Sequence, residues 1–481
     1  MAIPLNRREL MAALSGLSAF AQDSDNTHQA TGVKVGEVTP DSAVLWTRRT
    51  RTVRRFNEGV KREGRGREAR RVQPGEDLRT FEGACPGAPG QARVILEPAS
   101  GTGRRQTLPW TDLDPRDDFA HQFRIRGLAP ATEYRFAVET RASRGAASDA
   151  PLTGRFRTAP AQASPAPVQF ALLSCQAYHR RDRPGGFAIY SSIEKWRPDF
   201  LLGCGDNVYY DSEDPVADSV PVARYHWDRM FSLPTLRSCL RNVPGYWQFD
   251  DHDLWDNDCF PGMQKHKTAP LTLDEGRSVF RRQVPCPPEP NVFYRTFRWG
   301  TDVEIWLPDG RNYRAANDAP DGPEKSLWGV QQRQWLETTL KASQARWKIM
   351  INPNPIVGPD HARKNDNHAN PAFAHEGLAF RKWLKDHVSG RVVVMNGDRH
   401  WQYHSVDPDT GLHEFGCGPA SDAHAVPPSR GEDPRYHRFL RIKGGFLAVR
   451  VDPSSRDHSL VIEHRDVDGA TVHRQVFARP A

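Results

Sequence analysis

The chain lacks the hydrophobic run that a membrane-spanning helix needs. No segment of its 481 residues approaches the roughly 20 consecutive apolar residues that cross a bilayer. It also lacks a zinc finger, a basic zipper and an RNP pattern, so no nucleic-acid-binding module is expected. With 38% hydrophobic and 26% charged residues, the composition is typical of a soluble globular protein of two or three domains.

Paired cysteine motifs are also absent. The seven cysteines show no C-x-x-C spacing, which argues against a structural zinc site. Their odd number leaves at least one thiol unpaired. If the protein is exported, the other six can form disulfides, with the connectivity left open.

The positive charge is unevenly distributed. The net charge is +7 and the pI is near 9.0, and much of the excess lies between Arg48 and Arg71. Such a surplus can attract anionic substrates, or it can be a solvated basic surface. Both interpretations remain open at this point.

The N-terminus resembles an export signal. Residues 1–22 carry the pair Arg7-Arg8, then a short apolar stretch, with Ala19-Phe20-Ala21 as a plausible cleavage site. Adjacent arginines before a mild apolar run resemble a twin-arginine signal, so the twin-arginine machinery is an expected partner and the periplasm or the exterior an expected location. The alternative is a frayed amphipathic N-terminus.

Short strands separated by turns dominate the first third of the chain. Residues 31–158 predict a fibronectin-III-like β-sandwich, in which the GLAPAT turn joins two alternating strands. Residues 48–90 read as an exposed insertion, because they are rich in Arg, Glu and Gly and show little apolar periodicity. A nucleic-acid patch is the alternative for them, but aromatic residues are sparse there. The Pro/Ala-rich stretch 159–167 predicts a linker.

Beyond the linker, apolar runs end repeatedly in polar residues. The stretch 199–211, DFLLGCGDNVYYD, is the clearest case, and further runs end at residues 173, 249, 307, 351 and 395. Helical periodicity between them, as in 329–343, predicts an α/β layer fold. Asp468-Gly469 predicts a hairpin turn near the C-terminus.

Seven side chains that can bind metal ions lie just past these predicted strands. They are Cys175, Asp206, Tyr209, Asp251, Asn257, Asp398 and His400. If the strands share one sheet, the side chains converge at its carboxyl edge. Thiolate, phenolate and imidazole suit a transition metal, especially ferric iron, whereas carboxylates and an amide oxygen suit calcium, magnesium or manganese. A two-metal site of this kind serves phosphoester hydrolysis.

Three ordered blocks carry a family resemblance. They are GCGDNVYYD, FDDHDLWDND and NGDRHWQYHS, preceded by Ser174-Cys175. Together they resemble the metallophosphoesterase superfamily and, more narrowly, the PhoD-type alkaline phosphatases. The resemblance implies a metallophosphoesterase-type αββα sandwich over residues 168–481, preceded by the fibronectin-III-like domain. It also implies hydrolysis of small phosphoesters, as a phosphomonoesterase or phosphodiesterase.

The resemblance further implies a role for each residue. The ferric ion is expected on Cys175, Asp206, Tyr209 and His400, and one or two calcium ions on Asp206, Asp251, Asn257 and Asp398. Zinc or manganese are the alternative metals. A metal-bound hydroxide is expected to attack phosphorus.

Three further roles are implied around the metals. His252 is expected to be the general acid at the leaving oxygen, oriented by Asp253. Arg311 or Arg314 is expected to hold the phosphate oxygens. The irregular sequence at 307–311 departs from the family pattern at this clamp.

Two other functions remain open. One is a non-catalytic exported module, of an adhesion type, that uses calcium only for structure. The other is a phospholipase D-like hydrolase of phospholipid head groups. Tyr209 together with Cys175 favours catalysis, because calcium has no use for a thiolate. Among other residues, Cys204 is expected in the core, and His404 and His424 are candidates for the outer shell.

Overall fold

The computed structural model describes residues 26–478, with the exception of 101–102, 290–291, 362, 429–430 and 454–458. The predicted export signal, residues 1–22, lies outside the described residues. No helix among the described residues is long and apolar enough to cross a membrane. All seven cysteines are buried and free, so none of the disulfides considered from the sequence is present.

Two large sheets form the centre of the molecule. The first has nine strands in the order β21 (Thr471–Phe477), β20 (Leu460–Arg465), β19 (Phe446–Val451), β9 (Val168–Leu173), β10 (Phe200–Cys204), β11 (Gly245–Gln248), β1 (Val33–Gly36), β2 (Ser42–Arg48) and β6 (Ala120–Arg126). The second has seven in the order β12 (Arg295–Trp299), β13 (Val303–Leu307), β14 (Trp347–Asn352), β15 (Arg391–Asn396), β17 (His413–Cys417), β16 (Gln402–Val406) and β18 (His437–Arg441). The predicted hairpin at Asp468-Gly469 is confirmed by the antiparallel pairing of β20 with β21.

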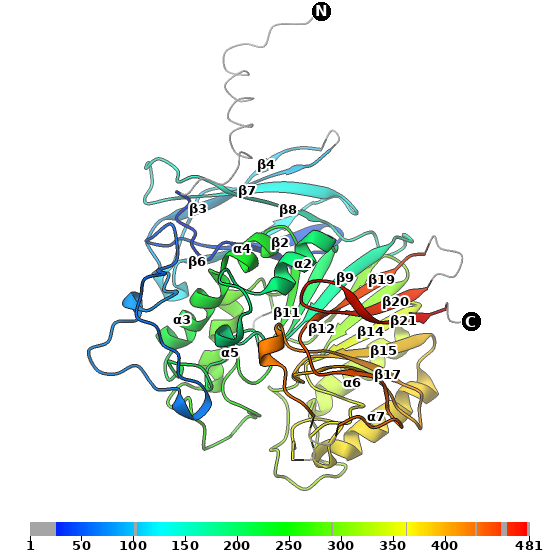
Figure 1. Cartoon of the computed structure of the whole chain (residues 1–481). Coiled ribbons are helices and arrows are strands. Elements are labelled where there is room, and N and C mark those ends of the chain that lie inside the picture. Colours follow the sequence, from blue (N-terminus) through cyan, green and yellow to red (C-terminus); the bar gives the residue numbers. More distant parts are fainter. Residues whose placement is uncertain are drawn as a thin grey trace, which may run out of the picture.

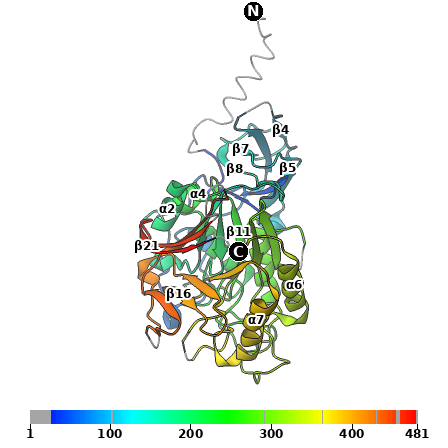
Figure 2. The same ribbon diagram turned by 90° about the vertical axis from the view of Figure 1, so that its right-hand side faces the viewer.

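The two sheets pack face to face and helices cover both outer faces. Phe170 and Phe200 of the first sheet meet Ile305 and Ile349 of the second in a buried apolar layer. The outer face of the nine-stranded sheet is covered by α2 (Ala188–Trp196), α3 (Val220–Phe231), α4 (Pro234–Leu240) and α5 (Leu273–Gln283). The other outer face is covered by α6 (Gly329–Ala342) and α7 (Ala374–His387). Figure 2 shows α2 and α4 on one side and α6 and α7 on the other, which confirms the predicted αββα sandwich.

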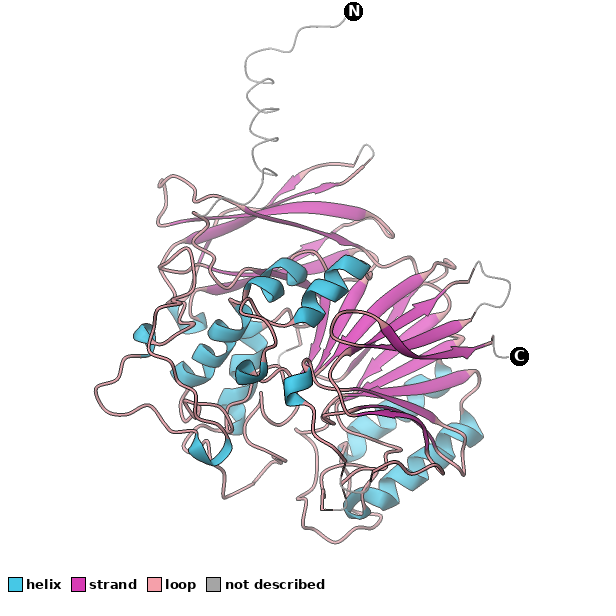
Figure 3. Cartoon of the chain, viewed as in Figure 1, coloured by secondary structure: helices cyan, strands magenta, loops and turns pink. Residues whose placement is uncertain are grey.

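A third, smaller sheet completes the N-terminal β-sandwich. It contains β4 (Gln106–Thr107), β3 (Gln91–Pro98), β7 (Glu133–Arg141) and β8 (Leu152–Arg157), with β5 (Thr111–Asp112) paired to β3. Its apolar face packs on β1, β2 and β6, and Figure 3 shows no helix over the outer face of this smaller sheet. Short 3-10 helices occur at η1 (Gly66–Glu68), η2 (Leu78–Thr80), η3 (Pro115–Asp117), η4 (Tyr178–Arg180), η5 (Pro371–Phe373) and η6 (Asp422–His424).

The GLAPAT turn joins two sheets and is not a hairpin. β6 before it belongs to the nine-stranded sheet, whereas β7 after it belongs to the smaller sheet. The Tyr134 hydroxyl accepts a hydrogen bond from the Ala129 N–H at 2.9 Å and so fixes this corner, as in other β-sandwiches. The alternating pattern predicted both strands correctly but could not show which partner each strand takes.

In the insertion 48–90, residues 51–80 are mostly exposed, whereas the end of the segment is buried. Phe81 and Ala84 are buried and pack on Tyr225 of α3. Arg62 forms an ion pair with Asp214 at 2.6 Å, so the segment is also tied to the chain beyond β10. Figure 1 shows the insertion in blue beside α3. The basic residues therefore hold the segment against the larger domain.

Candidate metal centre

The predicted site residues meet between the two large sheets, and not at the edge of one sheet. Parallel strands β9, β10 and β11 of the first sheet end beside parallel strands β14 and β15 of the second. A Cβ added at Gly397, just past β15, would lie 2.2 Å from the Ser174 hydroxyl and 2.7 Å from the Cys204 carbonyl oxygen. Only glycine allows the two sheets to approach this closely, and the polar loops of both sheets then face each other.

Asp206 is the central carboxylate of the site. Its Oδ2 accepts hydrogen bonds from the Tyr209 hydroxyl at 3.0 Å and from the Cys175 thiol at 3.5 Å. Ligand atoms of Cys175, Asp206 and His400 all lie within 4.8 Å of one another. The Oδ1 of Asp206 is buried and has no hydrogen-bond partner among the described residues. A buried, unpartnered carboxylate oxygen beside these donors fits a bound cation.

The backbone presents these ligands from an unusual conformation. Cys175, Asp206 and Asp398 have φ angles of 55°, 54° and 57°, in the left-handed region that non-glycine residues rarely adopt. Each such residue costs on the order of 1–3 kcal/mol. Because the same conformation recurs after three strands, it places three ligands rather than relieving one local clash.

Burial determines the protonation of the side chains around Asp206. Burial raises the pKa of the Cys175 thiol and of the Tyr209 phenol well above their ordinary values. It also lowers the pKa of His400 well below its ordinary value, so this imidazole is neutral. A Lewis-acidic cation would ionise the thiol and the phenol. Thiolate, phenolate and neutral imidazole together fit a transition metal.

A second, oxygen-rich group lies next to the first. Ligand atoms of Asp206, Asp251 and His252 lie within 4.8 Å of one another. The side-chain amide of Asn354 donates to Asp250 Oδ2 at 3.3 Å and to Asp398 Oδ2 at 3.1 Å. Its Oδ1 is buried and without a partner in the described part of the chain. Carboxylate and amide oxygens fit a calcium-like ion.

The predicted amide ligand, Asn257, is not the amide that contacts the carboxylates of this second group. Asn257 is exposed, and it is its backbone N–H, not its side chain, that contacts the site through Asp211 Oδ2 at 3.3 Å. Asn354 takes the expected place, because it follows β14 of the second sheet. The polar end of that strand, Asn352-Pro353-Asn354, was the only sequence signal for it.

The partner of His252 also differs from the prediction. His252 Nδ1 lies 2.6 Å from Asp211 Oδ1, whereas Asp253 does not contact the ring. Asp253 instead accepts the backbone N–H groups of Asp250 at 2.8 Å and Asn207 at 3.0 Å, so it holds two loops together. Although burial lowers the pKa of His252, the carboxylates of Asp211 and Asp251 raise it well above its ordinary value.

The two arginines of the predicted phosphate clamp are buried, and Nη1 of each has no hydrogen-bond partner among the described residues. Arg311 and Arg314 are 0% and 3% exposed. Arg311 lies 2.5 Å from Asp250 and 3.2 Å from Asp366, and it therefore neutralises carboxylates of the site. Asp309 accepts the Arg311 N–H at 2.9 Å and closes the irregular turn that carries the arginine inward.

Of the two histidines proposed for the outer shell, only His424 lies at the site. Its ring centroid is 4.1 Å from that of His400 and 5.4 Å from that of Tyr209. Its Nδ1 is 3.0 Å from the Cys175 carbonyl oxygen. His404 instead lies 2.9 Å from His413, nitrogen to nitrogen, away from the site. Cys204 is buried between the sheets, as predicted.

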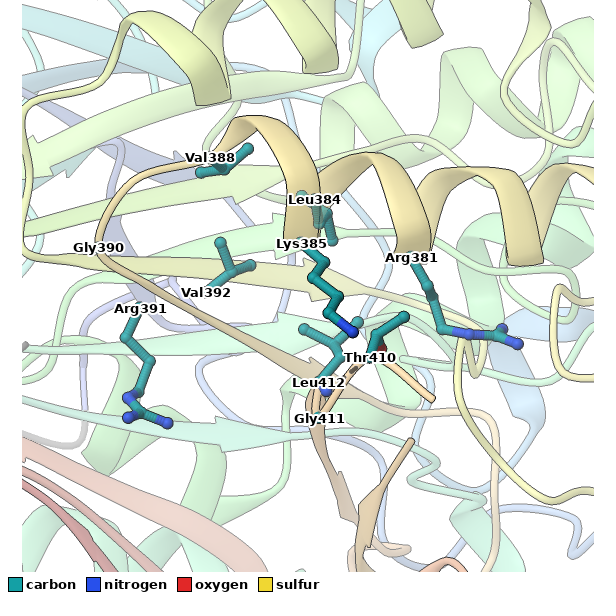
Figure 4. Close-up of a pocket in the computed structure, with 10 residues that line it drawn as sticks. All are labelled: Arg381, Leu384, Lys385, Val388, Gly390, Arg391, Val392, Thr410, Gly411 and Leu412. Atoms are coloured by element: carbon teal, nitrogen blue, oxygen red, sulfur yellow. Dashed lines mark hydrogen bonds between the residues drawn. The ribbon is translucent and has the colours of Figure 1, made fainter. Parts of the chain in front are cut away.

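A hollow of about 430 Å³ lies at the opposite end of β15. Figure 4 shows it between α7 and the start of the strand, with Lys385 directed over Leu412. Gly390 and Arg391 line it, whereas the site residues Asp398 and His400 follow the other end of the strand. The hollow is therefore separate from the metal centre.

Two facing sheets with metal-binding side chains at their carboxyl ends define a metallophosphoesterase-like protein. Family models support this class. The model of the PhoD-like phosphatase matches residues 170–438, and that of the PhoD-like phosphatase N-terminal domain matches residues 15–160. The chain belongs to the PhoD-like phosphatase family.

Individual relatives agree with this assignment. Alkaline phosphatase D of Bacillus subtilis is 22% identical over 333 residues, and the match covers 59% of this chain and 54% of the relative. Purple acid phosphatase 17 of Arabidopsis thaliana is 29% identical over 150 residues, covering 30% of this chain and 39% of the relative. The chain thus spans about half or less of these two relatives.

Solved structures show the same fold. A structure of PhoD superposes with a TM-score of 0.72 at 17% identity, covering 96% of this chain and 92% of the other. Purple acid phosphatase PPD1 from yellow lupin seeds superposes with a TM-score of 0.64 at 12% identity, covering 93% and 74%. At these low sequence identities, the two superpositions show a shared fold and nothing more.

Proposed function

We propose that this protein hydrolyses phosphoric esters at the centre built around Asp206, as a phosphomonoesterase or phosphodiesterase of the alkaline phosphatase D type. The observation that carries the proposal is the buried, unpartnered Oδ1 of Asp206 beside the thiol of Cys175, the phenol of Tyr209 and the imidazole of His400. This set fits a bound cation, and it adjoins the oxygen-rich second group, with which it shares Asp206.

The two groups would hold different metals. Cys175, Asp206, Tyr209 and His400 would hold a ferric ion, with zinc or manganese as alternatives. The neighbouring oxygen ligands would hold calcium, and they are Asp206, Asp251, Asn354 and Asp398. When bound, the metals supply Lewis acidity at the phosphoryl oxygens and an activated water.

The side chains around the metals have separate tasks. Because Asp211 holds Nδ1 of His252, the other ring nitrogen is left to give a proton to the leaving oxygen. The buried Arg311 fixes Asp250 through a contact of 2.5 Å. Arg399 contacts Asp398 and lies 2.7 Å from Asp360. These arginines keep the carboxylates in position.

Export is part of the proposal. It rests on Arg7-Arg8 and on the short apolar stretch that follows within residues 1–22. We expect the protein in the periplasm or the medium, and expect replacement of both arginines by lysine to retain it in the cytoplasm. Unchanged export of that variant would contradict the twin-arginine route.

The visible absorption spectrum tests the metal centre. A ferric ion bound by the Tyr209 phenolate and the Cys175 thiolate gives a charge-transfer band, which should shift or fade in Tyr209→Phe. Tyr210→Phe is the matched control, because the neighbouring Tyr210 hydroxyl contacts Trp227 at 2.6 Å and not the site. A colourless protein with stoichiometric metal would refute the iron assignment, and failure to cleave a chromogenic phosphodiester or monoester would refute the hydrolase.

A further inference from the structure

A second hollow lies between the insertion and the loop that follows β9. Its volume is about 710 Å³, within the range of about 300–1,000 Å³ that is usual for ligand sites. Five cationic side chains line it, and they are Lys61, Arg62, Arg65, Arg181 and Arg183. The first three come from the insertion and the last two from the loop, so the pocket exists only because the insertion packs there.

The cations of this pocket exceed the carboxylates available to them. Arg62 is paired with Asp214 and Arg183 with Asp468, at 2.6 and 3.0 Å. The other three cations, Lys61, Arg65 and Arg181, form no ion pair with a carboxylate in the described part of the chain.

The acidic side chains of the lining are mostly engaged elsewhere. Glu82 lies 2.7 Å from Arg55 and 2.9 Å from the Tyr178 hydroxyl. Asp182 accepts the Ala188 N–H at the start of α2 at 2.9 Å. Glu63 and the Asp182 carboxylate, which has no ion pair in the described part of the chain, remain to balance Lys61, Arg65 and Arg181, so the pocket keeps an excess of positive charge.

The floor of the pocket is rigid. The guanidinium of Arg181 stacks over the ring of Tyr178 at 4.2 Å. His179 is fixed through both ring nitrogens, because Nδ1 lies 3.2 Å from Glu213 and Nε2 lies 2.6 Å from the Arg62 carbonyl oxygen. A ligand that enters therefore meets Arg181 already in place, which lowers the entropic cost of binding, whereas the exposed side chains of Lys61 and Arg65 become ordered on binding.

The pocket adjoins the metal centre along the chain. Tyr178, in the floor, is three residues past Cys175. Arg65 forms a β-bridge with Glu213, which is two residues past Asp211, the partner of His252. From Cα spacings the backbone of Arg65 is at most about 13 Å from that of Asp211. The backbone at the edge of the pocket is therefore close to the backbone that positions the partner of His252.

We propose that this pocket binds a second anionic group of the substrate, carried on an ester arm of about 10–15 Å, comparable to the backbone separation of Arg65 and Asp211. The inference rests on the proposed function and adds a substrate class to it, namely extended phosphoesters with a further phosphate, carboxylate or sulfonate. The three unpaired cations select such substrates through KM, because they contact a part of the substrate that does not react.

A pair of matched substrates tests the proposal on the metal-replete enzyme. Both are nitrophenyl phosphodiesters with a ten-carbon alkyl arm, which ends in a phosphate in one and in a hydroxyl in the other. The wild type should show a KM about tenfold lower for the phosphate-ended substrate, corresponding to about 1.4 kcal/mol. Carboxylate- and sulfonate-ended arms then identify which anion is preferred.

Charge reversal within the pocket should abolish this preference. The double variant Lys61→Glu/Arg65→Glu should lose the tenfold difference and retain the KM and kcat of the hydroxyl-ended substrate. The matched control is Arg67→Glu/Arg70→Glu, which changes the charge equally on exposed residues of the same insertion that do not line the pocket. An unchanged preference in the pocket variant, or an equal loss in the control, would overturn the proposal.

A binding measurement decides the matter even if neither ester is cleaved. Inorganic tripolyphosphate is titrated calorimetrically into the protein with saturating orthophosphate present. We expect at least tenfold weaker binding in Lys61→Glu/Arg65→Glu and unchanged binding in the control. Equal affinity in all three proteins would overturn the anionic subsite, whereas absent hydrolysis alone would overturn only the proposed function.

Discussion

At the scale of residues, neighbouring positions of one loop have different tasks. In the sequence Asp250-Asp251-His252-Asp253, the first carboxylate pairs with Arg311 and the second lies within reach of Asp206. The third residue pairs with Asp211, and the fourth accepts backbone N–H groups. Consecutive side chains of a tight turn point in different directions, so adjacency in sequence did not identify the partner of His252.

Replacing Asp211 tests this partnership. Asp211→Asn should lower kcat by about 10- to 100-fold and shift the alkaline limb of the pH–rate profile to lower pH, because it removes the charge that keeps the general acid His252 protonated. Asp253→Asn is the matched control and should lower the melting temperature without moving the profile, since it leaves a backbone N–H unpaired. If only the Asp253→Asn variant shifted the pH–rate profile, Asp253 and not Asp211 would be the residue that orients His252.

Glu213 links the insertion to the region of the site and should make stability depend on pH. Burial alone would raise its pKa, but the hydrogen bond of His179 and the charge of Arg229 lower the pKa to about 2. His226, which also faces it, has its pKa lowered to about 3 by burial and by Arg229 and is neutral at higher pH. A carboxyl group whose pKa is lower in the folded than in the unfolded protein stabilises the fold at pH values above its ordinary pKa. This stabilisation is lost as the pH falls towards the lowered pKa.

The expected contribution of Glu213 is about 3 kcal/mol, lost between about pH 5 and pH 2. Urea unfolding at a series of pH values measures it. The wild type should lose stability more steeply than Glu213→Gln as the pH falls through this range, and Glu63→Gln, at an exposed position, should follow the wild type. Parallel curves for all three proteins would contradict the prediction.

At the scale of elements, helix α5 supports the loop that carries Asp251 and His252. A Cβ added at Gly276 of α5 would lie 1.7 Å from the Leu254 carbonyl oxygen. The Trp255 indole donates to the Leu271 carbonyl oxygen at 2.7 Å and joins the same loop to the start of the helix. A capping box between Thr272 and Glu275 fixes where the helix begins. The helix therefore fixes the position of the loop that carries Asp251 and His252 relative to the sheet.

Gly276→Ala should be strongly destabilising, although the same change in an open helix stabilises by about 1 kcal/mol. The methyl group must push α5 away from Leu254, at a cost of several kcal/mol by comparison with overpacked cores. Ser278→Ala, two residues further along the helix, should change stability by less than about 0.5 kcal/mol. Denaturant midpoints check both, and a stable Gly276→Ala enzyme with full activity would show that the loop does not depend on the helix.

At the scale of the whole molecule, the N-terminal sandwich and the larger domain share a sheet. β1 pairs in parallel with β11, with Gly36 opposite Gly245. The Lys34 ammonium donates to the Gln283 carbonyl oxygen at 2.7 Å, and the Trp46 indole donates to that of Arg282 at 2.6 Å. Both contacts cross from the sandwich to α5, so the two parts are joined by hydrogen bonds and by packing.

We therefore expect one cooperative unfolding transition for the metal-replete protein. Calorimetric and van't Hoff enthalpies should agree, because the sandwich cannot unfold without opening the nine-stranded sheet. Lys34→Met should lower the transition temperature without splitting the transition. Two resolved transitions, with the first removing only the strands of the sandwich, would show that the shared sheet does not couple them.

The strands, the main helices and most of the side chains that gather at the strand ends could be predicted from the sequence alone. Runs such as 199–204 and 391–396 are apolar and end in polar residues, and this information is local. The order of the motifs likewise determined the family. Cys175, Asp206 and His400 are found together because each follows the end of a buried strand.

Only the tertiary structure decided which strands share a sheet and which side chains face the site. Asn354 enters from the second sheet and Asn257 turns outward, while Arg311 becomes a buried counter-ion. The insertion likewise gained its pocket only by packing against the loop after β9. These outcomes depend on pairing between segments far apart in the chain, and local patterns of polarity carry no information about that pairing.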